Sequence, residues 1–165
     1  MKQYEDYLKL LGGRPLGRRS WRTAHWLCER EDNFESILEI GRHMGHSLGL
    51  FKYLWPDSRI VSIDIVPRKE ALAVIELFDA RDSIELIDGD VSKLDSSEIF
   101  DLVLIDGDHT HSGARADWEG IQQNISKGSI VVFDDLDHPL GCGNAFYEIE
   151  GYKTEQTETM GVVYI

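Results

Sequence analysis

Acidic side chains recur along the chain from residue 39 onward, and each lies at the end of a short apolar run. A single acid in such a place commonly caps a helix or belongs to a turn, but a series of them after successive runs is hard to ascribe to chance. Carboxylates that converge repel one another, and a bound divalent cation that prefers oxygen, such as Mg²⁺, Mn²⁺ or Ca²⁺, would relieve that repulsion. These acids are Glu39, Asp64, Asp88, Asp90, Asp106, Asp108, Asp134 and Asp135.

The acids after the fourth and fifth apolar runs are the candidates for a cation site. Asp106 opens the sequence Asp106-Gly107-Asp108-His109, and Asp134-Asp135 follow the next run. Ligand sites of open α/β sheets collect at the carboxyl ends of the strands, so we expect these side chains to lie near one another. The alternative is that Asp134 and Asp135 cap or solvate a surface loop.

The stretch Ser36–Ser47, with the sequence SILEIGRHMGHS, predicts a buried strand, a turn and a helix that begins near Ser47. Gly41 and Gly45 fit a turn with unusual backbone dihedrals or a place where a ligand comes close to the backbone. A strand–loop–helix junction of this kind directs helix N–H groups at a bound molecule. Asp64, at the end of the second run, is where a carboxylate could accept hydrogen bonds from a ribose diol.

The elements that would position these residues alternate between strands and helices. Continuous apolar runs rich in Ile and Val indicate strands buried on both faces, as in a parallel sheet covered by helices. We therefore predict a doubly wound, Rossmann-like α/β domain with a mostly parallel sheet, helices on both faces and a C-terminal antiparallel hairpin. The predicted strands are Ser36–Ile40, Arg59–Ile65, Ser83–Ile87, Asp101–Ile105 and Ser129–Phe133, and the hairpin is Gly151–Glu158 with Gly161–Ile165.

Apolar spacing predicts the helices between the strands. One follows Pro67, which suits a first helical turn, and another carries the stripe Ala114, Trp118, Ile121 and Ile125, with Gly128 as its C-terminal cap. Residues 1–33 hold two further predicted helices, separated by Gly12-Gly13 and by the basic cluster Arg14, Arg18, Arg19 and Arg22.

Composition limits the partners of the chain. Its 165 residues fit one domain, and a formal net charge of −13 argues against a nucleic-acid partner. No apolar run is long enough to predict a membrane span, and the acidic N-terminus is unlike a secretory signal. Cys28 and Cys142 form no metal or redox motif, so we expect a reduced, cytoplasmic setting.

The ordered motifs EIGRHMGHS, IVSIDIVP, LIDGDVSKL, FDLVLIDGDHTHSGARADW and GSIVVFDDL resemble those of class I S-adenosylmethionine-dependent methyltransferases. The resemblance is strongest to the group with an IDGDH motif, which includes macrolide-sugar O-methyltransferases. The chain is also similar to the metal-dependent catechol O-methyltransferases, which share the spacing E-x-G-x-x-x-G-x-S. The resemblance covers residues 36–165 as the S-adenosylmethionine-binding domain and leaves residues 1–35 as an N-terminal helical segment that would serve as a lid or an interface between two copies.

The resemblance implies a role for each matching residue. Gly41 and Gly45 would lie against the methionine part of the cofactor, supported by Glu39 and Ser47. Asp64 would bind the ribose, Asp90 the adenine amino group, and Val91 would pack on the adenine ring. The implied cofactor residues also include Asp106, and the implied metal ligands are Asp106, Asp134 and Asp135.

His109 matches the position of the general base. Methyl transfer is an in-line attack, so the enzyme aligns the nucleophile, and a hydroxyl nucleophile must lose its proton. A metal ion lowers the pKa of that hydroxyl, and a histidine, with a pKa of about 6.5, can accept the proton at neutral pH. His109 could instead be a loop residue with local hydrogen bonds, and His111 has no motif to support the same role.

The predicted function is thus methylation of a small hydroxylated acceptor, with Mg²⁺, Mn²⁺ or Ca²⁺ as the suspected metal. A metal-independent methyltransferase and a non-catalytic cofactor-binding module remain alternatives. An NAD enzyme is disfavoured because the loop lacks the middle glycine of G-x-G-x-x-G. The acceptor would be covered by residues 1–35, where Trp21 and Trp26 could line its pocket, and by the loop Leu136–Asn144.

Overall fold

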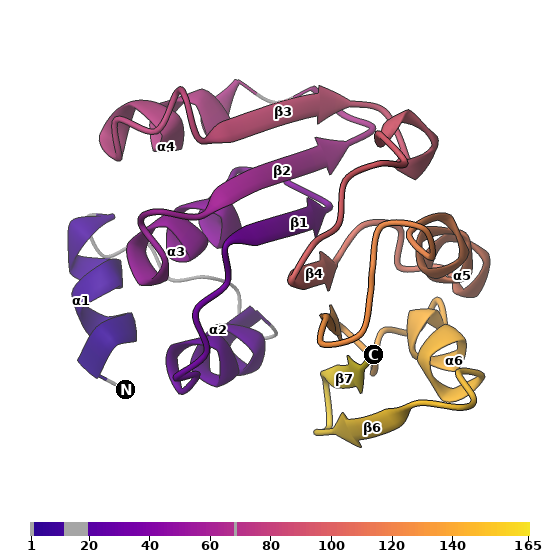
Figure 1. Cartoon of the computed structure of the whole chain (residues 1–165). Helices are drawn as coiled ribbons and strands as arrows, with labels where there is room; N and C mark the ends of the chain where they lie inside the picture. The colour runs from indigo at the N-terminus through magenta and orange to yellow at the C-terminus, as the bar shows by residue number, and fades with distance from the viewer. Residues whose placement is uncertain (1, 12–19, 68) are drawn as a thin grey trace.

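A computed structural model describes residues 2–11, 20–67 and 69–165 of the chain, without the side chains of residues 2, 20 and 21 (Figure 1). Arg14, Arg18, Arg19 and the side chain of Trp21 therefore lie outside the described part. The core of the structure is a seven-stranded sheet in the order β3-β2-β1-β4-β5-β7-β6. Its strands are β1 (Ser36–Ile40), β2 (Arg59–Asp64), β3 (Ile84–Asp88), β4 (Leu102–Ile105), β5 (Ile130–Phe133), β6 (Lys153–Gln156) and β7 (Gly161–Tyr164).

The strand pairing confirms the predicted doubly wound, mostly parallel sheet. Strands β1 to β5 pair in parallel, whereas β7 is antiparallel to both β5 and β6 and closes the predicted hairpin. Neighbouring residues of β1 face opposite sides of the sheet, since Ile37 belongs to one apolar cluster and Leu38 to the other. Both side chains are fully buried, which explains why the run reads as continuously apolar.

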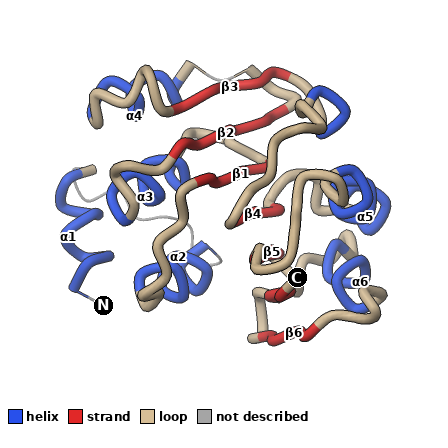
Figure 2. Tube along the Cα trace, viewed as in Figure 1, coloured by secondary structure: helices blue, strands red, loops and turns tan. Residues whose placement is uncertain are grey.

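Helices cover both faces of the sheet (Figure 2). One face packs against α1, α2, α3 and α4, and the other against α5, α6 and the short 3₁₀ helix η1 (Figure 1). None of the helices in the described ranges is long and apolar enough to cross a membrane. The helices are α1 (Lys2–Leu10), α2 (Ser20–Cys28), α3 (His46–Leu54), α4 (Glu70–Leu77), η1 (Val91–Lys93), α5 (His111–Gly120) and α6 (Cys142–Tyr147).

The N-terminal helices share the core of the sheet domain. Tyr4 and Tyr7 of α1 and Leu27 of α2 are buried in the same apolar cluster as Ile37 of β1. The Tyr7 hydroxyl also donates a 2.5 Å hydrogen bond to the carbonyl oxygen of His46, the first residue of α3. Residues on both sides of the predicted boundary at residue 35 thus bury their side chains together.

Two predicted helix ends are wrong. Helix α5 ends at Gly120, and Gly128 instead lies in the turn before β5 with φ +102°, where its N–H donates to the Ile165 carbonyl at 3.0 Å. Pro67 precedes α4 by three residues, because that helix begins only at Glu70. Helix α6 lies partly in the segment predicted as a loop, and its six residues are too few to show helical periodicity.

Candidate active site

The glycine loop lies where the carboxyl ends of β1 and β4 meet. Gly41 and Gly45 have φ angles of +96° and +83°, which favour glycine. A Cβ added to Gly41 would stand 1.9 Å from the carbonyl oxygen of Asp106, so the loop rests directly on the end of β4. A Cβ on Gly45 would approach Ala71 of α4 to 3.1 Å. Gly41 is therefore required by the packing of the loop itself, and Gly45 is favoured by its positive φ and its tight contact with Ala71, whatever molecule the loop binds.

Glu39 ties β1 to the start of the next helix. Its carboxylate is fully buried and accepts hydrogen bonds from the hydroxyls of Ser47, in α3, and Ser62, in β2. Burial raises the pKa of Glu39 to about 7, and the two hydroxyl donors oppose that rise. These contacts join the strand before the glycine loop to the helix after it, as the predicted supporting role of Glu39 requires.

The raised pKa of Glu39 makes the stability of the fold depend on pH. Its pKa of about 7 in the folded chain exceeds the ordinary value of 4.5, so folding favours the protonated carboxyl. This stabilisation is complete below pH 4.5 and is lost as the pH rises through 7. We expect Glu39→Gln to remove a pH dependence of about 3 kcal/mol in the free energy of unfolding between these limits. Urea unfolding of both proteins across this pH range measures the dependence. An equal change of the free energy of unfolding with pH in the two proteins would contradict the prediction.

Arg42, which the sequence analysis did not single out, attaches the glycine loop to β2 and β3. Its side chain is buried and donates to the Ser62 carbonyl at 2.9 Å and to Asp88 Oδ1 at 2.8 Å. Asp88, at the end of β3, is thus an ion-pair partner of the loop. An arginine just after a buried strand, with an acid at a later strand end, is the signal that could have suggested this pair.

The side chain of Asp64 binds the backbone of the same glycine loop. Its Oδ2 accepts the N–H of His43 at 2.8 Å, and its Oδ1 accepts the N–H of Val66 at 2.7 Å. Each carboxylate oxygen keeps a second lone pair for a ligand hydroxyl. Asp64 therefore stands at the end of β2 with its acceptor capacity partly used.

Asp90 and Val91 line a second cavity, of about 670 Å³, between η1 and α5. Asp90 caps η1 by accepting the N–H of Ser92 at 2.9 Å. Asp117 of α5 lines the same cavity, and burial, together with the charges of Asp108 and Asp90, raises its pKa to about 6. Sequence reasoning missed Asp117 because it belongs to a helix rather than to a strand end.

A histidine and two acids converge at the ends of β4 and β5. The Nε2 atom of His109 lies 3.4 Å from Asp106 Oδ1 and 3.3 Å from Asp135 Oδ2. One ligand atom from each of the three residues lies within 4.8 Å of the other two. Asp135 has φ 56°, a left-handed backbone that is costly for a residue other than glycine and is often found at functional sites.

The electrostatics of this cluster favour a positive charge between its acids. Burial raises the pKa of Asp106, and the nearby charge of Asp135 adds to that rise. The hydrogen bond to Asp106 raises the pKa of His109 above its ordinary value, although partial burial of the ring opposes it. A cation or an imidazolium between the two acids would therefore relieve their repulsion.

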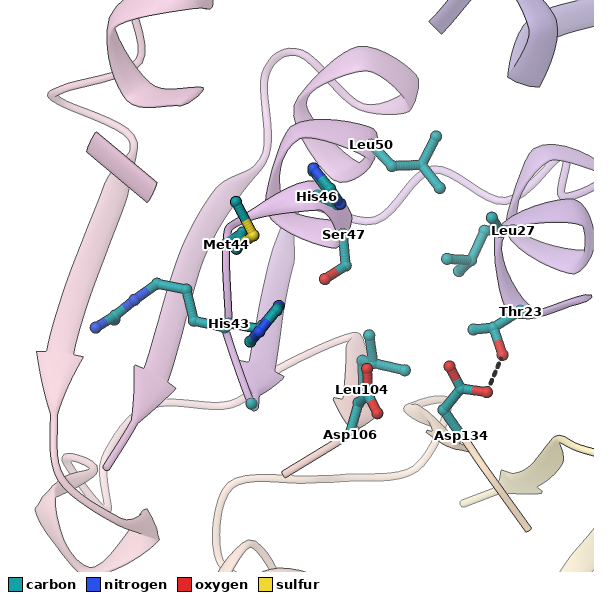
Figure 3. A pocket seen from close by; sticks show the side chains of 13 residues that line it. Thr23, Leu27, His43, Met44, His46, Ser47, Leu50, Leu104, Asp106 and Asp134 are labelled. Atoms are coloured by element: carbon teal, nitrogen blue, oxygen red, sulfur yellow. Dashed lines mark hydrogen bonds between the residues drawn. The ribbon is translucent and has the colours of Figure 1, made fainter. Parts of the chain in front are cut away.

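Asp134 lies beside this cluster and faces a different neighbour. Its Oδ1 accepts a hydrogen bond from the Thr23 hydroxyl of α2 at 2.8 Å (Figure 3) and another from the N–H of Asp135 at 2.9 Å. Burial, reinforced by the charge of Asp106, raises the pKa of Asp134 to about 8. Thr23 could not be found from the sequence, because nothing in its spacing connects it to a residue so far along the chain.

Asp106 and Asp134 also line one end of a cavity of about 350 Å³ (Figure 3). Gly41, His43 and Ser47 line it from the glycine loop and α3. Helix α2 covers another side with Thr23, Ala24 and Leu27. Trp26 of the same helix instead packs on the core, with the Arg30 guanidinium 4.6 Å from its ring centroid.

Two other predicted candidates have structural partners. His111 Nε2 lies 3.0 Å from Glu148 Oε1, on the side of α5 that faces α6. Trp118 packs in the core against Phe133 and Tyr152, with ring centroids at 6.0 Å and 5.9 Å. Neither residue belongs to the cluster around His109.

Comparison with known proteins assigns the class. A family model described as a methyltransferase domain matches residues 38–136, and the chain belongs to this family. The match spans all of the strand ends described above from β1 to β5. The prediction of a class I S-adenosylmethionine-dependent methyltransferase is confirmed by this match and by the fold. No curated protein matches the chain.

Solved structures share the fold at low sequence identity. An O-methyltransferase from Bacillus cereus in complex with S-adenosylhomocysteine is 18% identical, with a TM-score of 0.73 over 100% of this chain and 91% of that one. The O-methyltransferase TomG from Streptomyces achromogenes, in complex with S-adenosylmethionine, is 18% identical, with a TM-score of 0.71 over 100% and 90%. A methyltransferase from Podospora anserina with bound S-adenosylhomocysteine is 17% identical, with a TM-score of 0.72 over 98% and 86%.

Proposed function

We propose that this methyltransferase transfers the methyl group of S-adenosylmethionine to a hydroxyl of a small molecule, with His109 as the general base. The observation that carries the proposal is the position of His109 Nε2 between Asp106 and Asp135, beside the cavity under the glycine loop. Two of the fold neighbours named above are O-methyltransferases, which supports oxygen as the acceptor atom.

The cavity of about 350 Å³ suits the amino-acid end of the cofactor. Asp106 and Asp134 would offer carboxylates to an ammonium group, whereas the N–H groups of the first turn of α3 suit a carboxylate. The remaining lone pairs of Asp64 would accept the ribose hydroxyls, and the cavity lined by Asp90 and Val91 would take the adenine. When bound, the cofactor supplies an electrophilic sulfonium methyl group.

The acids of the cluster fit a divalent cation. Asp106 and Asp135 present oxygens that converge, and the burial of Asp106 makes an uncompensated negative charge there costly. Asp106 and Asp135 would hold Mg²⁺ or Mn²⁺, and the family resemblance implies Asp134 as a further ligand. The ion would lower the pKa of the acceptor hydroxyl.

The residues of the chain then perform the remaining steps. With its neighbouring acids holding the cation, His109 in its neutral form would accept the hydroxyl proton at Nε2. The glycine loop and α3 hold the cofactor in line with the acceptor oxygen. Helix α2, which the Thr23–Asp134 hydrogen bond attaches to the end of β5, would act as the lid that excludes water.

One observation favours a metal-independent reaction as the second candidate. His109 Nε2 lies 3.4 Å from Asp106 Oδ1 and 3.3 Å from Asp135 Oδ2, so a protonated imidazole would itself balance the two carboxylates. In that case the two acids would stabilise the imidazolium that forms when neutral His109 accepts the hydroxyl proton, and no cation would be needed. The two candidates differ in their response to a chelator.

Removing the cation or one of its ligands is expected to lower the rate of methyl transfer strongly. We expect transfer of radiolabelled methyl from S-adenosylmethionine to a member of a panel of catechols, sugars and hydroxy acids, in the presence of Mg²⁺ or Mn²⁺. EDTA or Asp135→Ala should lower this rate by at least about 100-fold, because the acceptor hydroxyl keeps its proton. Equal rates in both proteins, with and without EDTA, would favour the metal-independent candidate.

A further inference from the structure

The ring of His138 lies against the ring of His109. The two imidazoles stack with their centroids 4.6 Å apart and an angle of 28° between their planes. His138 belongs to the segment between β5 and α6 and is half-buried. The contact uses the face of the His109 ring, so it leaves the edge with Nε2 directed at Asp106 and Asp135.

Several backbone contacts hold His138 in this place. Its N–H donates to the Asp135 carbonyl at 2.8 Å, and its own carbonyl accepts the N–H of Gly141 at 3.0 Å. Its Nδ1 accepts the N–H of Leu140 at 3.3 Å. Four residues after His138, Cys142 donates its N–H to the carbonyl of His109 at 3.0 Å. The segment is therefore attached both to the acid Asp135 and to the backbone of His109 itself.

Stacking on His138 can fix the orientation of the His109 ring when the two acids are occupied by a cation. Asp106 and Asp135 orient His109 through the same oxygens that the proposed function assigns to a cation. When those oxygens serve a cation, they hold the imidazole less firmly, and a half-exposed side chain regains rotational freedom. Ring stacking does not compete with the cation, because it involves only the faces of the two imidazoles.

We infer that His138 is a positioning residue that fixes the plane of the His109 imidazole by stacking and keeps Nε2 turned toward the acceptor oxygen. The inference rests on the proposed function of His109 as the base. The positioning role depends on the ring of His138. A purely structural role would depend instead on the hydrogen bond between His138 Nδ1 and the N–H of Leu140.

Two variants separate the ring from the hydrogen bond. His138→Phe keeps a ring that can stack but lacks the Nδ1 acceptor. His138→Asn lacks the ring, but its side-chain oxygen can accept the N–H of Leu140 in an Asx turn. His111→Asn is the matched control, since that ring pairs with Glu148 away from the cluster.

The first measurement is the NMR signal of the His109 ring protons in the free protein, assigned by their loss in His109→Gln. We expect His138→Asn to shift these signals, whereas His138→Phe retains a ring-current shift and the control leaves the signals in place. With an acceptor from the panel, kcat should fall about 10- to 100-fold in His138→Asn and stay near wild type in His138→Phe. The KM for S-adenosylmethionine should be unchanged in both.

Unchanged His109 signals in His138→Asn would overturn the inference, as would equal losses of kcat in the two variants. If no acceptor is methylated, the proposed function fails, while the NMR comparison still decides whether His138 orients His109. Thermal unfolding of each variant establishes that the comparison is made on folded protein.

Discussion

Replacing His109 with glutamine is expected to lower kcat for methyl transfer by about 100- to 10,000-fold, the usual contribution of a general base. Glutamine is similar in length but cannot accept the proton of a hydroxyl at neutral pH. The affinity for S-adenosylhomocysteine should not change, because His109 is not among the residues that line the cavity under the glycine loop, which the proposed function assigns to the cofactor. The measurement is single-turnover transfer from radiolabelled S-adenosylmethionine, combined with calorimetry of S-adenosylhomocysteine binding.

His111→Gln is the control for this experiment. Both histidines lie near the start of α5 and both have a carboxylate partner, but the partner of His111 is Glu148. We expect the control to keep the wild-type rate. Activity that survives His109→Gln unchanged would exclude His109 as the base and leave the proton to solvent or to another side chain.

Gly41→Ala is expected to destabilise the fold by at least about 3 kcal/mol, the sum of a strained backbone and an overpacked contact. The residue has φ +96°, and a Cβ would lie 1.9 Å from the Asp106 carbonyl oxygen. That oxygen belongs to the end of β4, so it cannot move away without disturbing the cluster of Asp106 and His109. Urea unfolding measures the loss, and weaker S-adenosylhomocysteine binding should accompany it.

Gly151→Ala is the matched control for the backbone term. Gly151 has a similar φ of +85°, but nothing lies within 4 Å of its added Cβ. This variant should lose about 1 kcal/mol, the conformational cost alone. Equal losses in the two variants would show that the close approach of Gly41 to Asp106 contributes nothing.

The strands of this fold could be predicted closely because their signal is local. Buried runs such as Ser36–Ile40 are apolar at every position, and the predicted limits of that strand agree with the structure. Helix α6 could not be predicted, since it is short and its helical start depends on Gly141 at φ +89°. Its position is set by packing on α5, which no local pattern records.

The candidate site also contains residues that the sequence could predict and residues that only tertiary packing brings together. The parallel sheet brings Asp106 and Asp135 together because β4 and β5 are neighbours, and their closeness was expected from the position of both acids at the carboxyl ends of strands. Thr23 and Arg42 escaped prediction, since each meets its partner only through tertiary packing. The sequence also could not tell which of the two adjacent acids would face His109. In the structure Asp135 does so, and Asp134 pairs with Thr23.

Calorimetric titration of the wild-type protein with S-adenosylhomocysteine, S-adenosylmethionine and NAD tests the central claim most directly. The account predicts one-to-one binding of the first two and none of NAD. Asp64→Ala should weaken binding roughly 10-fold, because it removes the carboxylate assigned to the ribose hydroxyls. Heat on addition of NAD, with none for S-adenosylhomocysteine or S-adenosylmethionine, would contradict the account.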